Sequence, residues 1–301
     1  MMERIDWIVE EREGNSRLDR FLRFRLPGLP AKSIRFAIEA GEVRVNGKPG
    51  EKGESLRVGD RVFVNRIAEE RDWLPWPGDL PGASVLYEDE CVAVLEKPPD
   101  VHTEPQRPIE KGTLAGFLLH RYPIVEQISP TPGLTLLTRL DYATSGAIPA
   151  ALNEPSFARL IREREQGRIR KVYACVVAGR LREEMVLSGR IDSGGGAKVK
   201  VLSGSREPDP LRWTTVTPIR EGENATLVRA SICRGKRHQI RAHLAAAGFP
   251  ILGDRRYSAV PPMGPGKERL MLHASEVEFP HPRTGSLVRV VSPPPGEFQV
   301  I

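Results

Sequence analysis

From residue 84 onward, short apolar segments typical of strands outnumber segments with helical periodicity, and the two kinds do not alternate. Strict alternation would predict a doubly wound parallel sheet, whereas this order favours a mixed, mainly antiparallel sheet with helices packed on it. We therefore expect residues 84–301 to form one α+β domain. Strands are expected at residues 85–88, 92–96, 135–140, 172–177, 213–219 and 226–233, and helices at residues 113–122, 155–165 and 237–247.

Residues 1–66 have the pattern of a separate, small α+β module. A helix is expected at residues 18–26, where the apolar side chains fall on one face and a Pro-Gly pair follows. A second helix is expected at residues 32–40, before a glycine. Asn46 and Gly47, between valine-rich segments, indicate a hairpin. The module is therefore predicted to combine two helices with a small sheet.

Two segments rich in proline and glycine lie outside these elements. Residues 67–83 are expected to be a linker, which Trp73 and Trp76 hold against the following domain. Residues 261–268 are expected to be a surface loop, which is a candidate for contact with a bound partner and has no role assigned by the sequence.

Positive charge is concentrated in the module. Residues 17–66 contain twelve basic and six acidic residues, so their net charge of +6 equals that of the whole chain. A field concentrated on one small module suits phosphate binding, whereas a solvated, arginine-rich surface is the alternative interpretation. The candidates for phosphate contacts are Arg17, Arg20, Lys32, Arg35, Arg44 and Lys48.

The cysteines and the hydropathy pattern argue against several classes of protein. Cys91, Cys175 and Cys233 are far apart, so neither a zinc site nor a disulfide framework is indicated. No apolar run has the length of a transmembrane helix, and the polar N-terminus is unlike a signal peptide. We expect a monomeric, cytoplasmic protein without a membrane partner.

One apolar segment ends in a compact polar group that contains Arg139, Asp141 and a turn closed by Gly146. On a strand, Arg139 and Asp141 would point to the same face because they are two residues apart. A carboxylate at a strand end, facing a cleft, is suited to act as a nucleophile or a base. The alternative is a structural carboxylate that caps the turn and pairs with Arg139.

A second polar group lies in the basic segment of residues 234–244. On the expected helix, Arg237, Arg241 and Leu244 share one face, at positions i, i+4 and i+7. Arginine keeps its proton in proteins, so these side chains suit either a phosphate or a carboxylate partner. A solvated basic helix face is the alternative.

Tyr173 is the third candidate. In residues 171–179 it lies on the more polar face of the expected strand, where its ring could stack on a base. The alternative is a core tyrosine with a satisfied hydroxyl group.

Together and in this order, these segments resemble the RluA-type pseudouridine synthases over roughly residues 84–292. Residues 139–146 match that family's R-L-D-x-x-T-S-G motif, and residues 171–173 match its K-x-Y motif. The further matches are H-Q-I-R-x-H-L at residues 238–244, L-G-D-x-x-Y at residues 252–257 and L-H-A at residues 272–274.

The resemblance implies a role for each candidate. Asp141 falls on the family's catalytic aspartate, Tyr173 on the tyrosine that stacks on the target base, and Arg241 on the arginine that pairs with the aspartate. Arg139 is expected to help fill the space that the target base leaves, and Leu272 to contact the substrate. Because uridine inside a helix cannot reach a buried carboxylate, the resemblance implies that it is flipped out.

The implied reaction is isomerisation of uridine to pseudouridine within structured RNA. It needs no cofactor or metal, since it involves neither redox change nor phosphate transfer. Ribosomal RNA is favoured over transfer RNA as the target, because residues 17–66 separately resemble the alpha-L RNA-binding domain of ribosomal proteins. That match is carried by Arg17, Leu18, Asp19, Ser33, Gly41, Val43, Val45, Asn46, Gly47, Gly59 and Asp60.

The sequence departs from the family pattern at several positions. Thr138 replaces the usual histidine before R-L-D, and Glu96 replaces the usual asparagine before Lys-Pro. Lys236 and Arg237 replace the commoner Arg-Thr pair, and Pro149 is expected to interrupt an otherwise continuous apolar strand. These departures bear on substrate identity and local geometry.

Two other classes of function fit part of the sequence. A non-catalytic RNA-binding protein, such as a ribosome-assembly factor, would account for the basic module alone. A glycoside hydrolase would also act at an anomeric carbon, but it needs a second carboxylate beside Asp141, and these motifs supply none.

Overall fold

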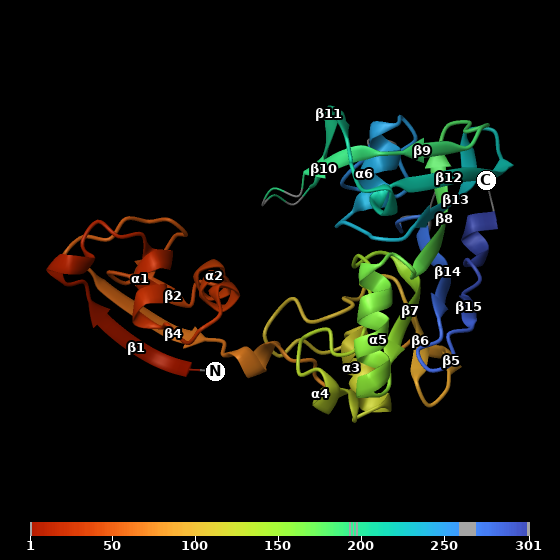
Figure 1. Ribbon diagram of the computed structural model, residues 1–301. Coiled ribbons are helices and arrows are strands. Elements are labelled where there is room, and N and C mark those ends of the chain that lie inside the picture. Colours follow the sequence, from red (N-terminus) through yellow and green to blue (C-terminus); the bar gives the residue numbers. More distant parts are fainter. Residues whose placement is uncertain (1, 193, 195, 197, 259–268, 300–301) are drawn as a thin grey trace. The chain divides into compact units, whose positions relative to one another are not determined.

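The computed structural model describes residues 2–192, 194, 196, 198–258 and 269–299 (Figure 1). The chain forms two compact units. The first comprises Met1–Trp76 and Pro105–Lys111, and the second comprises Pro77–Glu104 and Gly112–Ile301. The expected surface loop at residues 261–268 lies outside the described residues. None of the helices in the described ranges is both long and apolar enough to cross a membrane.

The first unit is an antiparallel sheet with two helices packed on it. Helices α1 (Leu18–Arg25) and α2 (Ala31–Glu39) confirm the two expected helices, and β2 (Val43–Val45) with β3 (Lys48–Pro49) confirms the hairpin. Strand β1 (Met2–Ile8) was not predicted, although Ile5 and Trp7 alternate with polar residues. It pairs with β4 (Arg61–Ile67), giving the order β1-β4-β2-β3.

The expectation that Trp73 holds the linker against the following domain is wrong. Trp73 is the last residue of a short 3-10 helix, η2 (Glu70–Trp73), and packs on α2 of its own unit. Its indole N–H donates to Ser33 Oγ at 2.8 Å, and its ring meets Phe36 edge-on at 6.0 Å. A buried indole needs both apolar contact and an acceptor for its N–H, and α2 supplies both.

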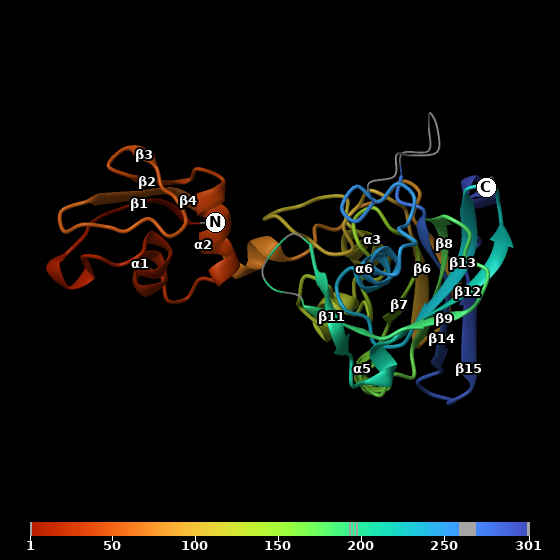
Figure 2. The same cartoon turned by 90° about the horizontal axis from the view of Figure 1, so that it is seen from above.

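The second unit is built on a nine-stranded sheet. The strand order is β5-β6-β7-β14-β8-β13-β12-β9, and β15 pairs with β14. Only β7 and β14 are parallel, so the expected mixed, mainly antiparallel sheet is confirmed (Figures 1 and 2). The strands are β5 (Ser84–Glu88), β6 (Val92–Lys97), β7 (Ser145–Ala151), β8 (Arg170–Ala178), β9 (Met185–Leu187), β12 (Thr214–Glu221), β13 (Ala225–Ile232), β14 (Leu272–Pro280) and β15 (Leu287–Val291).

Helices and short elements cover this sheet. Helices α3 (Leu114–Arg121) and α5 (Glu154–Glu165) begin where expected, because Thr113 and Asn153 accept backbone N–H groups of their first turns. Large apolar clusters fill the core of the unit. The remaining elements are η1 (Glu11–Glu13) in the first unit, and α4 (Val125–Ile128), α6 (Gln239–Ala246), β10 (Gly189–Asp192), β11 (Lys200–Arg206), η3 (Pro210–Arg212) and η4 (Gly296–Gln299) in the second.

The expected strand at residues 135–140 is not formed. Leu136 makes only an isolated bridge to Ala150 in β7, with Leu137 N–H donating to Pro149 O at 2.9 Å. The next ladder bond would require an N–H of Pro149, which proline lacks. The Leu137 carbonyl accepts from Arg164 Nη1 at 3.2 Å instead. Pro149 also does not interrupt β7, contrary to expectation, and it pairs with Val94.

Gly146 allows the close parallel pairing of β7 with β14. Its φ is +118°, and a Cβ atom at this position would lie 2.3 Å from Ala274 O. Any other residue would force the two strands apart, so glycine is required where the turn after Asp141 enters the sheet.

Candidate active site

Asp141 lies in the turn that leads into β7. Thr144 N–H donates to Asp141 O at 3.0 Å, which closes the turn. The preceding residue, Leu140, is fixed from both sides by Thr103, whose Oγ1 donates to Leu140 O at 2.9 Å and accepts from Leu140 N at 3.1 Å. The Asp141 side chain is about one-quarter exposed, so a bound molecule can reach it.

Arg241 joins Asp141 to a second carboxylate. Its Nη1 donates to Asp141 Oδ2 at 2.7 Å, while its Nε and Nη2 donate to the two oxygens of Asp254, each at 2.8 Å. Asp254 is fully buried and also accepts backbone N–H groups of Arg256 and Tyr257. The planar guanidinium of Arg241 is therefore fixed by a bidentate pair with Asp254, and a further N–H of the same group donates to Asp141.

The charges in this cluster support one another. Burial alone would lower the pKa of Arg241, but the hydrogen bonds and charges of Asp254 and Asp141 raise it above its ordinary value. Burial alone would raise the pKa of Asp254, whereas Arg241 holds it below its usual range. Both groups stay ionised, and Asp141 faces a permanent positive charge.

One oxygen of Asp141 is left for chemistry. Arg241 bonds Oδ2, and among the described residues no group donates a hydrogen bond to Oδ1. A partly exposed, ionised carboxylate with one open oxygen can act as a nucleophile or as a base.

The expected row of Arg237, Arg241 and Leu244 on one helical face is wrong. Helix α6 starts only at Gln239, because His238 adopts a left-handed conformation with φ +54°. Arg237 therefore lies outside the helix and donates to Gly196 O at 2.6 Å. Arg241 and Leu244 are both buried, so of the two expected partners for Arg241 the structure selects the carboxylate.

Arg139 does not share a face with Asp141, because residues 135–140 form no strand. Its side chain is 68% exposed and pairs with Glu104. The structural alternative, in which Asp141 pairs with Arg139, is therefore not observed.

Tyr173 and Leu272 come from neighbouring strands, β8 and β14. Tyr173 is 6% exposed and belongs to the apolar core, and burial, followed by the charge of Asp141, raises the pKa of its hydroxyl group. Leu272 is 4% exposed and pairs with Cys175 of β8. Tyr173 thus packs in the apolar core within the electrostatic reach of Asp141, but its hydroxyl group makes no hydrogen bond with the described residues.

Lys97, at the end of β6, is a further charged group near Asp141 that the sequence did not single out for the site. Its side chain is fully buried, and Nζ donates to Pro98 O at 2.8 Å and to Tyr142 O at 3.1 Å. Burial lowers the pKa of Lys97 to about 7, although Asp100 and Asp141 oppose this shift. The Lys-Pro pair of the family pattern, which follows Glu96, was the sequence signal that could have identified Lys97.

The lowered pKa predicts a pH dependence of stability. Between about pH 7 and the model-peptide value of 10.5, the unfolded chain binds more protons at Lys97 than the folded chain. The free energy of unfolding is therefore expected to rise with pH in this window. Urea unfolding of wild type and Lys97→Met at several pH values tests this, and equal slopes for the two proteins would contradict it.

The six predicted phosphate contacts all lie in the first unit. Arg17 pairs with Asp19 at 3.0 Å, Arg44 donates to Gly47 O at 3.3 Å, and Arg20 and Lys48 are exposed. Lys32 and Arg35 line a pocket of about 150 Å³ beside α1 and α2. The other lining residues are Asp19, Arg23, Ala31, Ile34 and Lys52.

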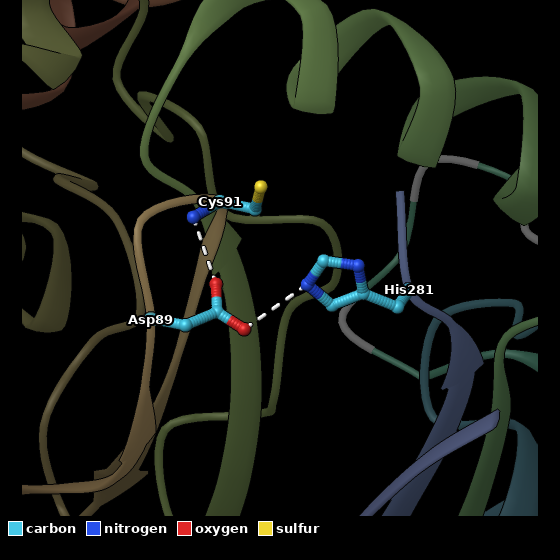
Figure 3. A group of neighbouring side chains, drawn as sticks. All are labelled: Asp89, Cys91 and His281. Carbon is cyan, nitrogen blue, oxygen red and sulfur yellow. Dashed lines mark hydrogen bonds and ion pairs between the residues drawn. The ribbon is translucent and has the colours of Figure 1, made fainter. Parts of the chain in front are cut away.

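Asp89, Cys91 and His281 bring three potential metal ligands within 4.8 Å of one another (Figure 3). The carboxylate oxygens of Asp89 already accept from Cys91 N, Val92 N, the Tyr87 hydroxyl and His281 Nε2. His281 Nδ1 accepts backbone N–H groups, so its proton lies on Nε2, whereas a metal-bound histidine donates from its other nitrogen. These hydrogen bonds link the segment that contains Asp89 and Cys91 to the segment that contains His281.

Comparison with known proteins identifies the class. The family model for RNA pseudouridylate synthase matches residues 92–246, about half of the chain. Together with the relatives below, this match shows that the chain belongs to the pseudouridine synthases, a family of RNA-modifying isomerases, and it confirms the resemblance to the RluA type. RNA is therefore its substrate, and the catalytic interpretation is favoured over a non-catalytic binding protein.

Particular relatives cover nearly the whole chain. The chain is 30% identical to the ribosomal large subunit pseudouridine synthase C of Salmonella typhimurium over 299 residues, which cover 93% of this chain and 90% of the relative. The enzyme of the same name from Escherichia coli K12 gives the same identity and coverage. The solved structure of human RNA pseudouridylate synthase domain containing 1 is 26% identical, with a TM-score of 0.57, covering 73% of this chain and 86% of that chain.

Proposed function

We propose that the protein converts uridine to pseudouridine in large-subunit ribosomal RNA, with Asp141 as the catalytic carboxylate. The Arg241–Asp141 contact carries the assignment of Asp141, because it places a permanent positive charge on one oxygen of a partly exposed carboxylate and leaves Oδ1 open. The target is supported by two relatives named as ribosomal large subunit pseudouridine synthases. The proposed enzyme acts as a monomer in the cytoplasm.

In the proposed reaction, the uridine leaves its helix and its ribose meets Oδ1 of Asp141. The bond between C1′ and N1 of uracil breaks, the base rotates, and C5 forms a new bond to C1′. The hydrogen on C5 is lost and N1 gains a proton, so atoms balance without a further reactant. Asp141 acts on the ribose either as a nucleophile or as a base.

The neighbouring residues have distinct parts in this proposal. Arg241 lowers the cost of keeping Asp141 charged when the base and ribose exclude water from the site. The ring of Tyr173 stacks on the target base, and Leu272 forms an apolar contact beside it. The exposed Arg139 moves from Glu104 to the space that the flipped base leaves.

The target can be tested in cells. Large-subunit ribosomal RNA from cells with and without the gene is treated with carbodiimide, which marks pseudouridine, and is then read by reverse transcription. At least one pseudouridine is expected to disappear without the gene and to return with the wild-type gene. Loss of a site only in transfer RNA would contradict the proposed target.

The module at residues 1–66, which the linker at residues 67–83 follows, is proposed to hold the RNA backbone. Arg35→Glu, in the pocket beside α1 and α2, is expected to weaken RNA binding and to lower the slope of log Kd against log salt by about one. Arg12→Glu makes the same charge change on a side chain that is 70% exposed elsewhere in this unit. Fluorescence titration at several salt concentrations measures both slopes. Equal effects of the two variants would mean that this pocket makes no specific phosphate contact.

A further inference from the structure

His238 is a buried titratable group that the proposed mechanism leaves unused. It stands immediately before α6 with φ +54° and ψ +20°, a left-handed conformation that residues other than glycine rarely adopt. Such backbone strain persists where the surrounding structure requires it. The side chain of His238 is only 9% exposed.

The hydrogen bonds of Tyr257 favour one position for the proton on the His238 ring. The Tyr257 hydroxyl oxygen lies 3.0 Å from His238 Nδ1 and accepts the N–H of Val199 at 2.8 Å. Since the backbone N–H can only donate, the hydroxyl hydrogen of Tyr257 is available for Nδ1, the acceptor that the described residues offer it. Nδ1 is then an acceptor, and the neutral ring carries its proton on Nε2.

The nitrogen that carries this proton, His238 Nε2, lies near Asp141, the proposed catalytic carboxylate. His238 Nε2 lies 3.8 Å from Asp141 Oδ2, the same oxygen that Arg241 bonds at 2.7 Å. Arg241 and the His238 ring thus approach the same oxygen of Asp141, and Oδ1 is the other, open oxygen. The distance is longer than a hydrogen bond, as is common for catalytic contacts before substrate is bound.

The charged groups around His238 keep it neutral. Burial lowers its pKa, the charge of Asp141 raises it, and the nearby Arg241, Arg256 and Arg237 lower it again. The result is a pKa below the ordinary value for histidine. The ring is therefore neutral at neutral pH and becomes a cation beside Asp141 only under acidic conditions.

We propose that His238 is a positioning residue for Asp141: its Nε2–H, fixed by Tyr257, turns the carboxylate so that Oδ1 meets the ribose. Protonation of His238 creates a second full positive charge at Oδ2. The imidazolium then binds the carboxylate tightly and weakens it as a nucleophile or base, so turnover falls at acidic pH. This inference rests on the proposed role of Asp141.

Two variants of His238 distinguish the effect of its side chain on Asp141 from the effect of its strained backbone. In His238→Gln, the amide nitrogen can take the place of Nε2 but does not titrate. In His238→Asn, the side chain suits the left-handed backbone but is too short to reach Asp141. We expect His238→Asn to lower kcat about 10- to 100-fold with little change in KM, and His238→Gln to retain most of kcat. Thermal unfolding checks that both variants are folded.

The pH dependence of kcat distinguishes a positioning role from a purely structural one, because a structural role would leave this dependence unchanged. In wild type, kcat is expected to fall on the acid side as His238 is protonated. In His238→Gln the side chain at this position does not titrate, so the fall that is assigned to His238 should be absent. Tyr257→Phe, which removes the bond that fixes the ring proton, should lower kcat as well.

The outcomes distinguish this inference from the proposed function. If Asp141→Asn is inactive while His238→Asn has wild-type kcat, or if His238→Gln keeps the wild-type pH profile, the inference about His238 is wrong and the role of Asp141 stands. If Asp141→Asn retains turnover, the proposed role of Asp141 fails, and the inference fails with it.

Discussion

Asp141→Asn is expected to lower turnover by about 10⁴-fold or more while leaving RNA affinity close to that of wild type. Asparagine has nearly the same shape, and its amide oxygen can still accept from Arg241 Nη1, so the site should keep its geometry. The amide is neither a nucleophile nor a base of useful strength. Single-turnover rates and filter-binding affinities measure the two quantities separately.

A matched control shows whether the loss is specific to this carboxylate. Asp79→Asn makes the same change at an exposed position of the same unit, where the N–H of Leu80 is the one donor to the carboxylate among the described residues. This variant should have wild-type turnover. If Asp141→Asn were active within about tenfold of wild type, Asp141 could not be the catalytic carboxylate.

Arg241→Met is expected to destabilise the second unit and also to abolish activity. The change leaves the fully buried Asp254 with no guanidinium, and breaking a buried ion pair from one side costs about 3–5 kcal/mol. Asp141 would also lose the hydrogen bond and the positive charge of Arg241 at Oδ2. Urea unfolding gives the first effect, and the turnover of the remaining folded protein gives the second.

A second substitution separates the two effects of Arg241. Asp254→Asn keeps an oxygen for the backbone N–H groups of Arg256 and Tyr257 but removes the buried charge. The double variant Arg241→Met, Asp254→Asn should therefore recover much of the stability and none of the activity. Recovery of both would show that Arg241 serves the fold alone. Wild-type stability of Arg241→Met would contradict the buried ion pair.

Elements that depend on local interactions could be predicted from the sequence. Helices α3 and α5 begin where Thr113 and Asn153 cap them, and these caps involve only the next three residues. The strand expected at residues 135–140 failed because its partner, β7, offers Pro149 where an N–H is needed. That conflict becomes visible only when the two segments are side by side, so periodicity within one segment could not reveal it.

In the candidate site as well, contacts between distant segments could not be derived from the pattern within one segment. Asp141 and Arg241 are 100 positions apart in the chain, and their pairing was expected only because the motifs resemble a known family. The bidentate contact of Arg241 with Asp254 was not predicted. The start of α6 was placed too early, since the left-handed conformation of His238 depends on tertiary contacts with Tyr257.

Release of tritium from RNA labelled at C5 of uridine tests the central claim most directly, because C5 loses its hydrogen only when it bonds to the ribose. Wild type and Asp141→Asn are compared on separate pools of large-subunit ribosomal RNA and transfer RNA. The account predicts release by wild type from the ribosomal pool and none by Asp141→Asn. Equal release by both proteins, or no release by wild type from RNA that it binds, would contradict it.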